Sequence, residues 1–114
     1  MDLDKIKKIV REFSSERNWD KYHTPKNLSM ALSVEASELV EIFQWLTQDE
    51  SKNIDSKEIQ SVKDEIADIL IYLIRIADKL DIDLEEAVLE KIKKNGEKYP
   101  VELSKDNAVK YNKR

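Results

Sequence analysis

The segment EIADILIYLI, residues 65–74, decides the fold of this chain of 114 residues. Seven of the eight residues from Ile66 to Leu73 are apolar or aromatic, and the exception is Asp68. Apolar residues continue at helical spacing on both sides of the segment, at Ile59, Val62, Ile66, Ile69, Leu73, Ile76 and Leu80. Because the run from Ile66 to Ala77 is apolar on nearly all sides, we predict a helix that is buried on more than one face, with a second subunit covering the extra face.

Two further helices are predicted before this one. The first runs from about Asp2, a candidate N-cap, to Asn18, with apolar residues at helical spacing. The second begins at the Thr-Pro pair of residues 24–25, where a capping hydroxyl precedes a proline in the first turn, and runs to about Leu46. The segment TQDESKNIDS then forms a loop, and Ser56 is expected to cap the third helix.

A fourth helix follows the opening segment. Asp83 and Glu86 resemble a capping box for it, and it is expected to fade near residues 95–96. We therefore predict an all-α chain with a four-helix bundle-like domain over residues 1–100, assembled as an oligomer. The tail over residues 101–114 has little periodicity and is expected to be disordered or packed on a neighbouring subunit.

The composition narrows the classes of function. Hydrophobic residues make up 40% and charged residues 39% of the chain, with one glycine and two prolines, which favours helices over disorder. The net charge of -4 and the pI of about 5.1 argue against binding to DNA or RNA. The absence of cysteine excludes disulfides and thiolate zinc sites. The N-terminus lacks a signal peptide's apolar core and the apolar run is too short for a bilayer, so we expect a soluble, cytoplasmic protein with no membrane partner.

Four carboxylates occupy helix positions that should bring them together. Glu35 and Glu38 are three residues apart on the second helix, and Glu65 and Asp68 have the same spacing on the third. Residues three apart share a helix face, and the short connection makes the two helices antiparallel neighbours, so the pairs can face each other. A divalent cation would relieve both the repulsion among them and the burial of Asp68. All-oxygen ligands suit Mg²⁺, Mn²⁺ or Ca²⁺ rather than zinc or copper.

These acids have two other interpretations. A solvated helix face explains any single pair, because 24 acids among 114 residues give about five such pairs by chance. Two pairs that both interrupt apolar stripes are less ordinary. A di-iron helical bundle also builds carboxylate sites, but it needs Glu-x-x-His motifs, and the only histidine, His23, has no such spacing. The acids therefore favour a magnesium-type site.

The same residues carry a resemblance to a known family. EASE at residues 35–38, 26 intervening residues and EIAD at residues 65–68 look like the E-x-x-E and E-x-x-D motifs of the MazG-like all-α nucleoside triphosphate pyrophosphohydrolases. The stretches ERNWDKYHTPKNL, ELVEIFQW, DEIADILIYL and KIKKNGEKYP resemble the dCTP pyrophosphatase branch of that family, over about residues 13–100. Ser37 is a mild departure, because the branch commonly has glycine or a small apolar residue between its first two acids.

The resemblance implies a reaction and a cofactor. Family members depend on Mg²⁺, for which Mn²⁺ can substitute, and hydrolyse nucleoside triphosphates, mostly deoxy, to the monophosphate and pyrophosphate. A metal-activated water attacks the α-phosphorus, and Glu38 is a candidate general base. The acids that match the catalytic metal ligands are Glu35, Glu38, Glu65 and Asp68. Related proteins are dimers or tetramers built as dimers of dimers, and the implied role is removal of dCTP-like nucleotides.

The resemblance also implies a side that binds the nucleoside. Trp19 and Trp45 match the base-stacking tryptophans of the branch. The alternative for Trp45 is a core residue that ends the second helix. The other candidates for substrate contacts are His23, Tyr72, Lys91, Asn95, Lys98 and Tyr99. Each has an alternative role that does not involve substrate. His23 would make a hydrogen bond within its loop, Tyr72 would pack against neighbours, and the remaining four would form a basic surface turn.

Two functions besides the enzyme stay open at this point. One is a non-catalytic helical oligomer that binds a nucleotide or a protein and holds a structural cation. The other is an adaptor whose acids are surface charges. The presence of all four acids favours the enzyme, while base and sugar preference and the choice between dimer and tetramer are not fixed by the sequence.

Overall fold

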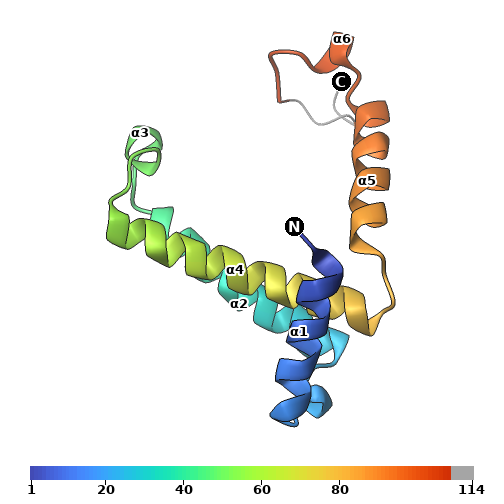
Figure 1. Cartoon of the computed structure of the whole chain (residues 1–114). Helices are drawn as coiled ribbons and strands as arrows, with labels where there is room; N and C mark the ends of the chain where they lie inside the picture. The colour runs from blue at the N-terminus through green and yellow to red at the C-terminus, as the bar shows by residue number, and fades with distance from the viewer. Residues whose placement is uncertain (109–114) are drawn as a thin grey trace. The chain divides into compact units, whose positions relative to one another are not determined.

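Helices make up all the regular secondary structure in the described residues, 1–108, of the computed structural model (Figure 1). The all-α prediction is confirmed. The elements are α1 (Leu3–Glu16), the 3₁₀ helix η1 (Asp20–Tyr22), α2 (Pro25–Phe43), α3 (Gln48–Ser51), α4 (Ser56–Lys79), α5 (Leu84–Lys98) and α6 (Val101–Ser104). The chain divides into two compact units, one up to Asp81 and one from Ile82 on.

Side-chain caps begin the first long helices where the sequence predicts them. The carboxylate of Asp2 accepts a hydrogen bond at 3.0 Å from a backbone N–H one turn into α1. The hydroxyl of Thr24 accepts one from the backbone N–H of Asn27 at 3.2 Å. Pro25 then occupies the first turn of α2, where its missing N–H costs no helical hydrogen bond.

Two features of the following segment differ from the prediction. Asp55 caps α4, because its side chain accepts from the backbone N–H of Glu58 at 2.8 Å, so the assignment of the cap to Ser56 is wrong. Both residue types are good caps, and only the backbone path distinguishes neighbours. The predicted loop contains the short helix α3, which begins with a complete capping box formed by Thr47 and Glu50.

The second unit contains α5 and α6. Asp83 caps α5 by accepting from the backbone N–H of Glu86 at 3.0 Å, which is one half of the predicted capping box. The helix does not fade at Gly96 but continues two residues further, since one glycine inside a helix costs only about 0.5–1 kcal/mol. Part of the expected tail forms α6, and its residues 109–114 lie outside the described residues. The domain boundary at residue 100 stays a prediction.

Three helices pack together in the first unit. α2 and α4 run antiparallel, and α1 crosses α4 (Figure 1). The buried apolar residues are few, namely Leu28 from α2 with Ile74 and Ala77 from α4. The C-terminal half of α4 therefore lies at the centre of the unit.

The apolar run on α4 is only partly covered from Ile66 to Leu73. Ile66 is 52% exposed and Leu73 40%, and Asp68 is exposed as well. α1 and α2 supply most of the cover of α4 within the first unit, and the second apolar face is open there. The predicted second subunit stays a prediction. Neither α4 nor any other helix within residues 1–108 is long and apolar enough to cross a membrane.

Candidate active site

Three carboxylates meet between α2 and α4. Glu35 and Glu38 lie one turn apart on α2, Glu65 lies on α4, and one oxygen of each lies within 4.8 Å of the other two. Glu35 and Glu65 are half-buried, whereas Glu38 is exposed. Helical spacing and antiparallel packing thus bring together three of the four acids that the sequence singles out.

The charge of this cluster is poorly compensated. A hydrogen bond with Glu35 is the largest cause that raises the pKa of Glu65 to about 7, followed by burial of the carboxyl group and by the neighbouring Glu38. That hydrogen bond needs a shared proton, because ionised carboxylates only accept. The Oε2 atom of Glu65 is buried and has no hydrogen-bond partner among residues 1–108. An orphaned buried oxygen beside two further carboxylates is a set of donor atoms that fits a hard divalent cation.

Asp68 lies outside the three-carboxylate cluster. Its side chain is exposed, so the expectation that this aspartate is buried within the apolar run is wrong for the described residues, 1–108. Its carboxylate makes no hydrogen bond or ion pair with any residue of the described range. Burial, the charge of Glu35 and the charge of Asp68 raise the pKa of Tyr72, so the phenol lies near both acids.

Trp19 belongs to an aromatic group at the turn before η1. Its ring meets the ring of Phe13 edge-on, with 5.8 Å between centroids, and His23 lies 6.1 Å away. The guanidinium of Arg17 lies 3.5 Å over the ring of Phe13. Because Trp19 is still 41% exposed, part of its ring is accessible to a ligand.

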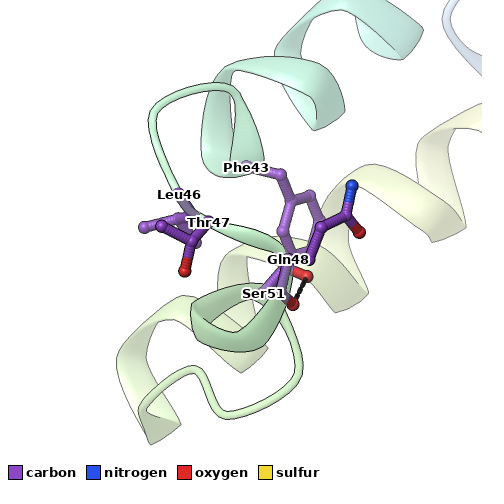
Figure 2. A pocket seen from close by; sticks show the side chains of 5 residues that line it. All are labelled: Phe43, Leu46, Thr47, Gln48 and Ser51. Carbon is purple, nitrogen blue, oxygen red and sulfur yellow. Dashed lines mark hydrogen bonds between the residues drawn. The ribbon is translucent and has the colours of Figure 1, made fainter.

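Trp45 lies in the turn that follows α2. It is 86% exposed, which excludes the alternative of a core position within the first unit. The next residues line an open pocket together with the end of α2 and with α3, as Figure 2 shows. The lining residues are Phe43, Leu46, Thr47, Gln48 and Ser51. This turn offers a flat apolar surface beside polar side chains.

The remaining predicted contact residues belong to the second unit. Lys91, Asn95 and Lys98 lie in the second half of α5, and Tyr99 is its C-cap. The charge of Lys98, and a hydrogen bond with it, lower the pKa of Lys91, and Lys94 adds to the effect. A bound anion would relieve this repulsion. The lysines belong to the second unit and the carboxylates to the first.

Arg75 is a functional candidate that the sequence analysis missed, although it is a charged residue within the apolar run. It is 3% exposed, and its guanidinium pairs with Asp20 and lies 3.4 Å from Oδ2 of Asp78. Its Nε donates to Nδ1 of His23 at 3.4 Å. Burial and the charge of Arg75 lower the pKa of His23, so the ring is neutral near pH 7. The available signal was an arginine within an apolar helix, because a buried guanidinium requires acidic partners.

Comparison with known proteins shows the family to which this chain belongs. The model of the MazG-like family matches residues 30–113, a range that includes the carboxylate cluster and Asp68. The chain belongs to the MazG-like family. The family resemblance that the acid motifs carry in the sequence is thereby confirmed.

Named proteins and a solved structure are similar to this MazG-like chain. Proteins named dCTP pyrophosphatase 1 from Mus musculus and Homo sapiens are 40% and 38% identical to it over 111 residues, which is 96% of this chain. The chain spans about 65% of the length of these curated relatives. The crystal structure of a pyrophosphatase from Archaeoglobus fulgidus DSM 4304 is 44% identical with a TM-score of 0.83, and the match covers 88% of this chain and 94% of that one.

The carboxylate cluster predicts a pH-dependent stability for the metal-free protein. Because the pKa of Glu65 is raised from 4.5 to about 7, the folded protein holds this proton more tightly than the unfolded chain. The stabilisation is therefore full below about pH 4.5 and is lost as the pH rises through about 7. With a chelator present, we expect the melting temperature of the parent, relative to that of Glu65→Gln, to fall between about pH 4.5 and 7. A difference that is constant or rises with pH would contradict the assignment.

Proposed function

We propose that this chain is a nucleoside triphosphate pyrophosphohydrolase that acts on a dCTP-like nucleotide. Water adds at the α-phosphorus, the bond from that atom to the bridging oxygen of the β-phosphate breaks, and the monophosphate and pyrophosphate are released. The observation that carries the proposal is the carboxylate cluster with the orphaned Oε2 atom of Glu65. The names of the dCTP pyrophosphatase 1 relatives and of the similar pyrophosphatase structure support it.

The proposed cofactor is Mg²⁺, with Mn²⁺ as a substitute. Glu35, Glu38 and Glu65 would hold it, and Asp68, one turn along α4, is the fourth candidate ligand. When bound, such a cation lowers the pKa of water and neutralises charge on the leaving pyrophosphate. Glu38 is the candidate general base, because it is the exposed member of the cluster and is accessible to water.

The nucleoside is proposed to lie against aromatic side chains of the first unit. Trp19 and Trp45 both keep ring surface open for stacking on a base. Tyr72 lies near Glu35 and is proposed to contact the sugar. His23 can donate from Nε2, since its Nδ1 already accepts a hydrogen bond.

The end of α5 is proposed to supply further polar contacts. Repulsion among its ammonium groups, seen in the lowered pKa of Lys91, favours binding of an anion such as a phosphate. The residues concerned are Lys91, Asn95, Lys98 and Tyr99.

A homo-oligomer, either a dimer or a tetramer as a dimer of dimers, is proposed as the working form. Val34 and Val40 on α2, like Ile66 and Leu73 on α4, are at least 40% exposed. Covering such surface is favourable by about 25 cal/mol per Å². We also propose that the family domain spans residues 1–100 and that the protein acts in the cytoplasm, without nucleic acid or membrane partners.

The proposal is tested by incubating the common nucleoside triphosphates with the protein and Mg²⁺ and separating the products. We expect dCTP to yield dCMP and pyrophosphate. A diphosphate with free phosphate would contradict the stated reaction. Nucleotide binding without turnover would favour the alternative, a non-catalytic oligomer that holds a structural cation.

Asp68→Asn tests the fourth acid of the proposed metal site. Because Asp68 is exposed and unpaired within residues 1–108, the metal-free variant should unfold with a free energy within about 0.5 kcal/mol of the parent. With Mg²⁺ it should gain less stability, and hydrolysis should fall about 100-fold or more. Asp64→Asn, which changes another exposed acid of α4, is the control and should behave like the parent. An active Asp68→Asn would remove this residue from the catalytic set.

Substitution of the two tryptophans tests the nucleoside side. Trp19→Ala and Trp45→Ala should each weaken binding of a dCTP analogue with a methylene α–β bridge by about 1–3 kcal/mol, the usual contribution of one stacked aromatic ring. Calorimetric titration measures the change. Tyr22→Ala, which removes another exposed aromatic ring close to Trp19 in the sequence, should bind like the parent. If both tryptophan variants retain parent affinity, the base is bound elsewhere.

A further inference from the structure

One face of α4 carries acids of the proposed metal site and the buried arginine. Glu65, Asp68, Tyr72 and Arg75 follow one another at intervals of three, four and three residues, so they form a single stripe along the helix. With a rise of 1.5 Å per residue, Arg75 lies about 10 Å further along the axis than Asp68. The helix therefore connects the carboxylates rigidly to the position of Arg75.

Arg75 joins η1 to α4. Its Nη2 atom pairs with Asp20 of η1, its Nη1 atom lies 3.4 Å from Asp78 of α4, and its Nε atom donates to His23. Lys79 adds a second cation 3.7 Å from Asp20. At 3% exposure the guanidinium cannot touch a substrate, so any effect of Arg75 on the reaction acts through these partners.

The element that Arg75 holds has little stability of its own. η1 contains three residues, none of them buried, and no side chain caps its start. Trp19 is the residue at its N-cap and His23 the residue at its C-cap, and their backbones are tied to η1 by hydrogen bonds of 2.8 and 3.1 Å. Because so short a 3₁₀ turn depends on outside contacts, the pair with Asp20 also fixes where Trp19 and His23 lie.

We propose that Arg75 is a positioning residue that sets the separation between the carboxylate cluster and the Trp19–His23 pair. A nucleoside triphosphate held by its phosphates at one end and by its base at the other fits only when this separation matches its length. The inference rests on the proposed function, because it assigns the two ends of the substrate to these two groups. Arg75 then acts on substrate binding and takes no part in the chemical step.

Arg75→Met tests this role, since methionine fills an apolar site flexibly without the charge. We expect the KM for dCTP to rise about 10-fold, within the range for one base-stacking contact, while kcat stays within about 2-fold of the parent. The matched control is Arg11→Met. Arg11 donates to the same Asp78 at 3.0 Å from α1 and makes no hydrogen bond or ion pair with η1 within residues 1–108, so its loss should leave the KM unchanged.

A second measurement does not depend on activity. The chain has two tryptophans, so Trp45→Phe leaves Trp19 as the only indole emitter. In that background Arg75→Met should shift the emission of Trp19 to longer wavelength as η1 loosens, and Arg11→Met should not. If Arg75→Met fails to fold, Asp20→Asn, which changes the half-exposed partner, must give the same rise in KM and the same emission shift.

The outcomes separate this inference from the proposed function. A parent that hydrolyses no nucleoside triphosphate overturns the proposed function, and the emission shift then still decides whether Arg75 positions Trp19. A parent that hydrolyses dCTP, together with an Arg75→Met or Asp20→Asn variant that keeps the parent KM, overturns the inference. A fall in kcat at unchanged KM overturns it as well.

Discussion

Like-charged carboxylates held between two packed helices are the constraint on which the rest of this structure depends. Glu35 and Glu65 project from α2 and α4, and the same two helices supply the buried residues Leu28, Ile74 and Ala77. The acids therefore cannot move apart without opening the core. The pKa of Glu65, raised to about 7, reflects this enforced proximity of carboxylates. A proton or a divalent cation relieves their repulsion.

Local rules account for much of what the sequence predicts correctly. The acids meet because residues three apart share a helix face and a short connection sets neighbouring helices antiparallel. The starts at Asp2, Thr24 and Asp83 were predictable because a cap acts within a single turn. α3 was missed because four residues show no periodicity, although its capping box, Thr47 with Glu50, is present in the sequence and would have revealed it.

Other features depend on the arrangement of the chain in space. The pair of Arg75 and Asp20 joins residues 55 positions apart, and no local pattern states where η1 lies along α4. The exposure of Asp68 was unexpected because an apolar run predicts burial, whereas the neighbours available in one chain determine how much of the helix is covered. The acid motif was thus predictable from the sequence, but the contacts of Arg75 that hold η1 beside Trp19 and His23 were not.

The buried guanidinium also restricts how this sequence can evolve. Loss of Asp20 or Asp78 alone leaves the buried guanidinium with one counterion fewer, and loss of Arg75 alone removes the cation that the two acids share. Breaking such a set one residue at a time is costly, whereas exchanging the whole set for apolar residues can be neutral. These positions are therefore expected to covary, so that a lineage keeps the complete charged group or replaces it as a unit.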